Sequence, residues 1–271
     1  MSSQNRNGNS KPTANAATLL QNAHLEGNVS DASLQALNGV DLGAQIQAGL
    51  GVCVDDVEAS EVLLLTILVD DSSSISSAQA TATVRAGYNL VIDALNASKQ
   101  KDGVLVHTRY LNGNVLCPYR PIEGAPLMDN RNYQPNGGTP LYDQCVVALG
   151  AVLAKVQEFT DAGVVARSVT LVITDGADMH STRAASRDVA ALVRDVTRQE
   201  GHIVAAMGIA DGSTDFRAVF RDMGIADAWI LTPGSGQADI RRAFQVFSQS
   251  AVRASQSTRF SASGGMGGFM N

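Results

Sequence analysis

The chain has 271 residues with 45% apolar and 17% charged residues, which suits one sizeable α/β domain with appendages. Its 20 basic and 26 acidic residues give a net charge of −6, and no run of Lys or Arg could follow a phosphate backbone, so we expect no nucleic-acid partner. Three scattered cysteines, a polar N-terminus and the lack of a membrane-length apolar run predict a cytoplasmic protein with reduced thiols and no membrane span.

Residues 1–60 differ in composition from the rest of the chain and form an acidic N-terminal extension. Residues 1 to about 13 are rich in Ser, Asn and Gly, which predicts disorder, and short helices are predicted over 14–24, 31–37 and 41–48. The extension holds two basic and six acidic residues, a net charge of −4. Three roles stay open for it: a helical layer on its own core, an acidic arm that reaches a neighbour's metal, or a flexible linker.

Residues 61–255 alternate strand and helix signals. Val62–Val69 is a continuous apolar run, as expected of a parallel strand covered on both faces. Ser76 and Gln79 have the spacing of a capping box, which predicts the start of a helix there. Two strands, 104–111 and 115–119, are joined by an Asn-Gly-Asn turn typical of a hairpin, and Pro118 places the second strand at the sheet edge.

A long loop over 120–138 leads to the second half of this region. Thr139 is predicted to be the N-cap of the next helix, with Pro140 at its first position. Further strands are predicted over 169–174, 203–209 and 228–231, and further helices over 184–199, 216–223 and 240–247. The pattern predicts an α/β, doubly wound, Rossmann-like domain: a mostly parallel sheet with one antiparallel edge strand and helices on both faces. A Gly- and Ser-rich flexible tail is predicted over 256–271.

Oxygen-bearing side chains stand where two of these strands end. Three of them, spaced as Asp-x-Ser-x-Ser, directly follow the first strand, a threonine follows a Pro-Asn-Gly-Gly turn, and an aspartate ends the fourth apolar run. The carboxyl ends of parallel strands meet at one edge of a sheet, so these groups are expected to converge. The sequence therefore predicts one divalent metal site, with Mg²⁺ as the preferred ion and Mn²⁺ or Ca²⁺ as alternatives. Its candidate ligands are Asp70, Ser72, Ser74, Thr139 and Asp175.

The mixture of ligands indicates how such a site would act. Neutral hydroxyls would contact the ion, while the two aspartates orient those hydroxyls and the bound waters from behind. A cation surrounded in this way stays electrophilic and favours a carboxylate from another molecule as its last ligand. The site is therefore interpreted as a docking point for a protein partner that supplies Asp or Glu.

The segments Asp70-Asp71-Ser72-Ser73-Ser74, Gly137-Gly138-Thr139-Pro140 and Thr174-Asp175-Gly176 resemble the von Willebrand factor A (vWA) domain with its metal-ion-dependent adhesion site (MIDAS). The resemblance covers about residues 62–255. The stretch 244–257 is most similar to the bacterial intracellular, TerY-like type, which implies partners in stress or tellurite-resistance systems. One departure is Asp71, where the family more often has a neutral or apolar residue; its carboxylate could raise cation affinity or point into solvent.

Two other functions were weighed against a metal-dependent interaction module. A Mg²⁺-dependent phosphatase with Asp70 as nucleophile would need a second carboxylate at position 72, which is a serine, so we expect no enzyme. A self-assembling structural protein would use the extension and tail for homo-oligomer contacts and keep the metal only for stability. His180, in the loop after Asp175, is expected to be a solvated loop histidine rather than part of the site.

Overall fold

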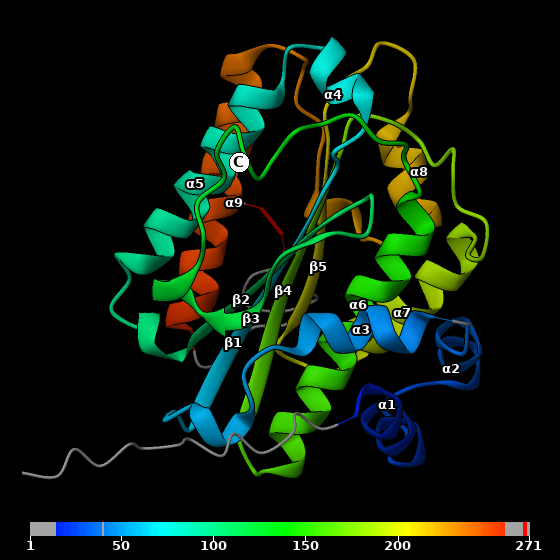
Figure 1. Cartoon of the computed structure of the whole chain (residues 1–271), viewed down its shortest axis with the longest axis vertical. Coiled ribbons are helices and arrows are strands. Elements are labelled where there is room, and N and C mark those ends of the chain that lie inside the picture. Colours follow the sequence, from blue (N-terminus) through cyan, green and yellow to red (C-terminus); the bar gives the residue numbers. More distant parts are fainter. Residues whose placement is uncertain (1–14, 40, 258–267, 270–271) are drawn as a thin grey trace, which may run out of the picture.

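The computed structural model describes residues 15–39, 41–257 and 268–269, and a single twisted sheet forms the centre of this part of the chain (Figure 1). The sheet order is β3-β2-β1-β4-β5-β6. All neighbouring strands are parallel except β2 and β3, which pair antiparallel at the edge. This confirms the predicted fold class, including its antiparallel edge strand. The strands are β1 (Glu61–Val69), β2 (Val104–Tyr110), β3 (Val115–Pro121), β4 (Val165–Thr174), β5 (His202–Gly208) and β6 (Ile230–Leu231).

Strands β1 and β4 lie side by side at the centre of the sheet. Their register pairs Val69 with Ile173, and the backbone N–H of Asp70 donates to the carbonyl of Ile173 at 2.9 Å. Both strands are buried along almost their whole length, because helices cover both faces of the sheet. The residues that follow the two strands therefore emerge next to each other at one rim.

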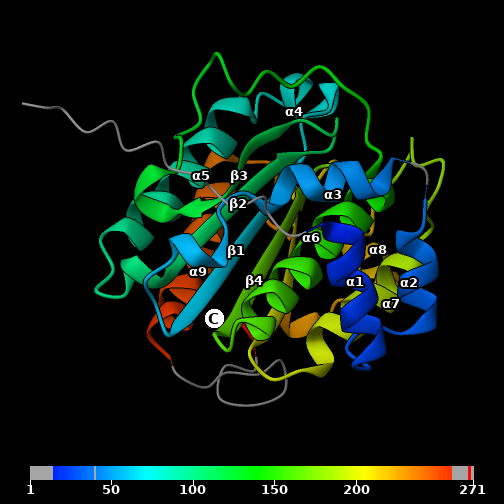
Figure 2. The ribbon, with the colours of Figure 1, turned by 60° about the horizontal axis from the view of Figure 1, so that its bottom comes forward.

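Helices cover both faces of the sheet, as Figures 1 and 2 show. One face carries α5 and α9, which approach closely, since a Cβ on Gly87 would lie 2.0 Å from the Phe244 ring. The other face carries α6 and α7, with α8 beside β5. The helices are α4 (Ser73–Ser77), α5 (Thr81–Asn96), α6 (Leu141–Asp161), α7 (Ser186–Arg198), α8 (Phe216–Asp222) and α9 (Gln237–Gln256), and the 3₁₀ turns are η1 (Val54–Asp56), η2 (Lys101–Gly103), η3 (Ile122–Gly124) and η4 (Asp227–Trp229).

The extension forms a third layer on the outside of α6. Its helices are α1 (Ala16–Leu25), α2 (Asp31–Leu37) and α3 (Leu42–Leu50). Helix α6 is buried around its whole circumference, because the sheet covers one side and this layer covers the other. Gly150 lets the layers meet, since a Cβ there would lie 2.6 Å from Leu37 and 2.8 Å from Ile46. The described part of the extension thus packs on its own core, the first of its three predicted roles; residues 1–14 lie outside the described residues.

Polar contacts also fasten this layer. Asp195 on α7 is buried, and its Oδ2 accepts hydrogen bonds at 2.7 Å from both the backbone N–H and the hydroxyl of Ser30, the N-cap of α2. Just after α3, the carbonyl of Val52 accepts a hydrogen bond from the Lys155 ammonium of α6, which also donates to Glu158. A buried donor that loses its acceptor costs more than an ordinary hydrogen bond contributes, so these contacts fix the position of the layer.

Two predicted helix starts are wrong in detail. Ser76 lies inside the short helix α4, and Gln79 has a φ of 56°, which ends that helix and delays α5 to Thr81. Helix α6 begins at Leu141 with Pro140 as its N-cap, so Thr139 lies one residue before the cap. The predicted edge position of Pro118 is confirmed, because its strand pairs on one side only, with β2.

Two residues of the predicted flexible tail are described, and they pack on the domain. Phe269 donates its backbone N–H to Ala228 at 2.9 Å, and its ring meets Trp229 edge-on at 5.2 Å between ring centroids. The rest of the tail beyond Ser257 lies outside the described residues, and its flexibility stays a prediction. In the part of the chain that the structure describes, none of the helices is both long and apolar enough to cross a membrane.

We expect Asp195→Ala to lower the free energy of unfolding by about 2–3 kcal/mol, because two donors of Ser30 lose a buried acceptor. Arg194→Ala on the same helix is the matched control, since its side chain is exposed. Urea unfolding followed by circular dichroism measures both variants. Equal stability of the two would show that the Asp195 contact does not hold the extension in place.

Burial lowers the pKa of His107 to about 3, with the Arg109 charge as the second cause. His107 lies under α3, bonded through Nδ1 to the carbonyl of Cys117 at 2.8 Å. The unfolded chain binds a proton near pH 6.5 and the folded chain does not, so this group's contribution to stability is complete above pH 6.5 and falls on acidification. The destabilisation caused by His107→Gln should therefore shrink by about 1.4 kcal/mol per pH unit between pH 6 and 4 in urea titrations. A pH-independent difference would contradict this.

Candidate metal centre at the carboxyl rim of the sheet

The turn that follows β1 lies at the rim where the parallel strands end, beside helix α4 (Figure 1). Asp70 is fully buried there, and its carboxylate is held from two sides. Oδ1 accepts the backbone N–H of Ser72 at 2.8 Å, and Oδ2 accepts the hydroxyl of Thr174 at 2.6 Å. Its carbonyl accepts the hydroxyl of Tyr133 at 2.6 Å. Asp70 thus lies behind the turn and fixes its shape, as expected of a carboxylate that orients other groups.

Three further predicted ligands form a chain of hydrogen bonds across the rim. The hydroxyls of Ser72 and Ser74 lie 2.8 Å apart, and Ser74 donates to Oδ1 of Asp175 at 2.7 Å. This chain connects the end of β1 to the end of β4, across 101 residues of sequence. The convergence follows from the register of the two strands, which brings Asp70 and Asp175 to one edge.

Thr139 reaches the same rim through its backbone. Gly137, two residues earlier, forms a bridge with Ser72, and its carbonyl accepts the N–H of Ser73 at 3.0 Å. Thr139 is 6% exposed. Its hydroxyl makes no hydrogen bond to the other predicted ligands within the described residues, so the side-chain contacts join Asp70, Ser72, Ser74 and Asp175 to one another but not to Thr139.

His180 fixes the backbone of Thr139. Its Nδ1 accepts the N–H of Thr139 at 2.9 Å, while the carbonyl of Thr139 accepts the N–H groups of Met179 and His180 at 3.1 and 3.3 Å. The ring lies over Gly138, where a Cβ would come within 2.9 Å of the imidazole. His180 is exposed, as expected of a solvated loop histidine, but its ring is also bonded to the segment that carries Thr139.

The loop after Asp175 also caps the N-terminus of α6. Asp178 accepts the N–H of Tyr142 at 3.1 Å, and the hydroxyl of Ser181 accepts the N–H of Asp143 at 2.9 Å. In return, the buried carboxylate of Asp143 accepts backbone N–H groups of residues 182–184 at 2.7–3.1 Å. These reciprocal bonds satisfy donors that a helix N-terminus leaves free, and they lock the loop to the helix.

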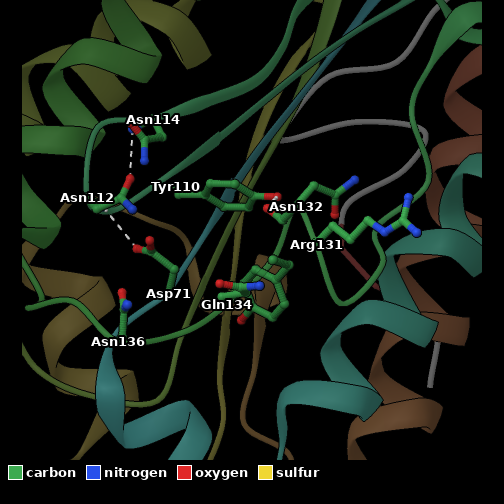
Figure 3. A pocket seen from close by; sticks show the side chains of 9 residues that line it. Asp71, Tyr110, Asn112, Asn114, Arg131, Asn132, Gln134 and Asn136 are labelled. Carbon is green, nitrogen blue, oxygen red and sulfur yellow. Dashed lines mark hydrogen bonds between the residues drawn. The ribbon is translucent and has the colours of Figure 1, made fainter.

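Asp71 points inward and not into solvent. It is 3% exposed, its Oδ1 accepts the N–H of Asn112 at 3.0 Å, and its carbonyl accepts the N–H groups of Asn136 and Gly137 at 2.9 and 3.1 Å. It therefore ties the hairpin turn to the loop before Thr139. Figure 3 shows that Asp71 also lines a polar pocket of about 230 Å³ between this turn and this loop.

The rim is rich in negative charge. The pKa of both Asp71 and Asp175 is raised to about 6, mainly by burial and also by the nearby charge of Asp70. Among the described residues no group of three or more His, Cys, Asp or Glu is placed to hold a metal ion. A cation at this rim would therefore have to use the serine and threonine hydroxyls, together with water, and the donor set of Ser72, Ser74 and Thr139 fits a hard ion such as Mg²⁺.

Sequence reasoning missed two supporting residues, Thr174 and Tyr133. Thr174 was named only within the Thr-Asp-Gly segment, and Tyr133 had no signal, because it lies in an irregular loop whose path depends on tertiary contacts. His180 was interpreted as a solvated histidine, although its ring bonds the segment that carries Thr139.

We expect Gly138→Ala to displace the His180 ring and to weaken divalent-ion binding several-fold, because the new methyl occupies the space of the imidazole that holds Thr139. Gly176→Ala is the matched control, since a Cβ there meets no atom within 4 Å. Calorimetric titration with Mn²⁺ compares the two variants. His180→Ala removes the same contact without a clash and should behave like Gly138→Ala; wild-type affinity in both would rule out a role for this contact.

Comparison with known proteins gives a likeness of fold. No protein-family model and no curated protein sequence matches the chain. Among solved structures, it is similar to the pilus adhesin SpaC from Lactobacillus rhamnosus GG in its open conformation, with a TM-score of 0.54 and 12% identity over 73% of this chain. It is also similar to proximal thread matrix protein 1 from the mussel byssus with a zinc-occupied MIDAS motif, with a TM-score of 0.50 and 14% identity over 71% of this chain.

A third match is a von Willebrand factor type A structure from Catenulispora acidiphila, with a TM-score of 0.47 and 17% identity over 71% of this chain and 43% of the other. The chain spans 31% of the length of SpaC and 46% of the mussel protein. At these identities the likeness concerns the fold alone. With its six-stranded sheet, antiparallel edge strand and helices on both faces, the chain shares the fold of SpaC and of the mussel protein with its MIDAS motif, which is the arrangement predicted for a vWA domain.

Proposed function

We propose that the protein is a metal-dependent interaction module, in which a divalent cation at the rim accepts a carboxylate from a protein partner. The observation that carries the proposal is the hydrogen-bond chain Ser72–Ser74–Asp175, with Gly137 bridged to Ser72 beside it. Hydroxyls that bond one another and a carboxylate at one point are placed to turn toward a shared cation. In this proposal Ser72, Ser74 and Thr139 would contact the ion.

The two aspartates would act from behind this group. Asp70 already accepts two hydrogen bonds, from Ser72 and Thr174, so it is placed to orient neighbours. Asp175 accepts from Ser74 and would orient that hydroxyl and bound water. Because neutral groups predominate around the ion, a partner's Asp or Glu would complete its coordination. Mg²⁺ is the proposed ion, and the mussel protein with zinc in its MIDAS motif supports a divalent cation in this fold.

We propose binding rather than catalysis on the basis of the groups that the site contains. The position where a phosphatase would need its second carboxylate is Ser72, whose hydroxyl bonds Ser74 and leaves no acid or base there. Self-assembly through the extension finds no support in its described part, because α1 to α3 are packed on α6 of the same chain. A cytoplasmic location and a TerY-like role in stress or tellurite resistance remain predictions from the sequence.

We expect wild-type protein to bind Mn²⁺ or Mg²⁺ and Ser74→Ala to bind at least tenfold more weakly, because the variant loses a hydroxyl that bonds both Ser72 and Asp175. Ser76→Ala is the matched control: it removes an exposed hydroxyl from the same short helix. Electron paramagnetic resonance of Mn²⁺ measures free and bound ion in each sample.

The partner half of the proposal is tested with a peptide library that contains a fixed Asp at its centre. Wild-type protein should retain peptides in Mg²⁺ and release them in chelator, and Thr139→Ala should retain none. Peptide retention that survives full removal of divalent ions would overturn the proposed role of the metal.

A further inference from the structure

A polar pocket lies directly beside the proposed metal site. Its volume is about 230 Å³, below the ~300–1,000 Å³ of sites for drug-sized ligands, so it suits a single side chain and not a whole cofactor. Asp71 belongs both to this pocket and to the turn between Asp70 and Ser72. The pocket and the proposed metal site therefore share one backbone turn, and a single extended segment of a partner could occupy both.

Four polar groups in the pocket can accept a hydrogen bond from a ligand, and they lie beside the donor groups of Asn112, Asn114, Asn136 and Arg131. Asp71 is 3% exposed, and while Oδ1 accepts the N–H of Asn112, Oδ2 has no hydrogen-bond donor within the described part of the chain. Gln134 uses its amide N–H on the carbonyl of Asn130, which leaves its Oε1 free. The hydroxyls of Tyr110 and Tyr133 both donate to backbone carbonyls, of Asn132 and Asp70, so each retains only acceptor capacity toward a ligand.

Two charged residues line the pocket: the buried Asp71 and the exposed Arg131. Figure 3 shows the guanidinium of Arg131 extending away from Asp71, on the far side of the pocket. Arg131 is exposed, and its charge acts on Asp129, which lies outside the pocket lining. The buried carboxylate of Asp71 thus has no cationic partner within the pocket.

We infer that this pocket binds an arginine side chain of the partner, near in sequence to the carboxylate that the metal takes. A guanidinium presents five N–H donors in one plane, which matches a carboxylate oxygen, an amide oxygen and two phenol oxygens better than a compact ammonium does. A charged hydrogen bond to Asp71 also supplies the positive charge that the buried carboxylate lacks. This inference rests on the proposed function, because the metal-bound carboxylate places the partner over the rim.

The pocket is tested first without metal. Ethylguanidinium is titrated in chelator into ¹⁵N-labelled protein, and the side-chain amide signals of Asn112, Asn114, Gln134 and Asn136 are followed. We expect saturable shifts in the wild type and at least tenfold weaker binding in Asp71→Asn, which keeps the Oδ1 acceptor for Asn112. Asp93→Asn, an equal charge change on the exposed side of α5, should leave the titration unchanged.

Arg131→Gln provides a second measurement that does not depend on the folding of the Asp71 variant. Removal of the positive charge of Arg131 from the outer edge of the pocket should strengthen ethylguanidinium binding about two- to threefold at low salt, because the two cations repel each other. n-Butylamine should bind more weakly than ethylguanidinium in the wild type. Absence of a saturable shift in the wild type, or wild-type affinity in Asp71→Asn, would overturn the inference.

The peptide library with a fixed Asp then separates this inference from the proposed function. Wild type in Mg²⁺ should enrich Arg at one constant distance from the Asp, and Asp71→Asn should lose the Arg preference while keeping the requirement for Asp and Mg²⁺. Metal-dependent retention without an Arg preference would refute the pocket and leave the proposed function standing. Ethylguanidinium binding without metal-dependent retention of peptides would refute the proposed function and leave the pocket as a guanidinium site.

Discussion

The parallel pairing of β1 with β4 is the constraint on which the rest of the rim depends. Because Val69 is opposite Ile173, the two strands end together, and the side chains that follow them meet across more than a hundred residues of sequence. A shift of one residue would turn Asp70 or Asp175 to the other face of the sheet. Eight buried residues of β1 and their partners on β4 oppose such a shift, so the hydrophobic core determines the geometry of a polar site.

The loops at the rim are held in position by hydrogen bonds to backbone groups more than by packing. Asp71 binds the hairpin turn and the 136–137 segment, and His180 binds Thr139. Buried backbone groups are costly to leave unpaired, so each of these bonds restricts the path of its loop. The buried carboxylates of Asp70, Asp71 and Asp175 give the rim its negative charge, and this charge is the reason for both the proposed cation and the proposed guanidinium of the partner.

Sequence was informative where regular periodicity or a fixed turn residue determines the structure. It predicted the sheet, the edge hairpin at Asn112–Asn114 and the convergence of Ser72, Ser74 and Asp175, because strand ends and turns follow local rules. It misplaced the start of α5, since Gln79 has a positive φ, which residue type does not predict for glutamine. It gave no sign of the Tyr133 contact and only the position of His180 near the site, because a loop tyrosine or histidine acquires its partner only when distant segments meet.

Helix α6 joins two regions of the molecule that sequence distance separates. Its 21 residues span about 31 Å, with the Thr139 segment at one end and the extension packed along its outer side. If this helix tilted or slid, α1, α2 and α3 would have to move with it, and the hydrogen bond between Ser30 and Asp195 would break. The Thr139 side of the rim is therefore held in place by the extension on the outer side of α6 as well as by the hydrogen bonds of the rim itself.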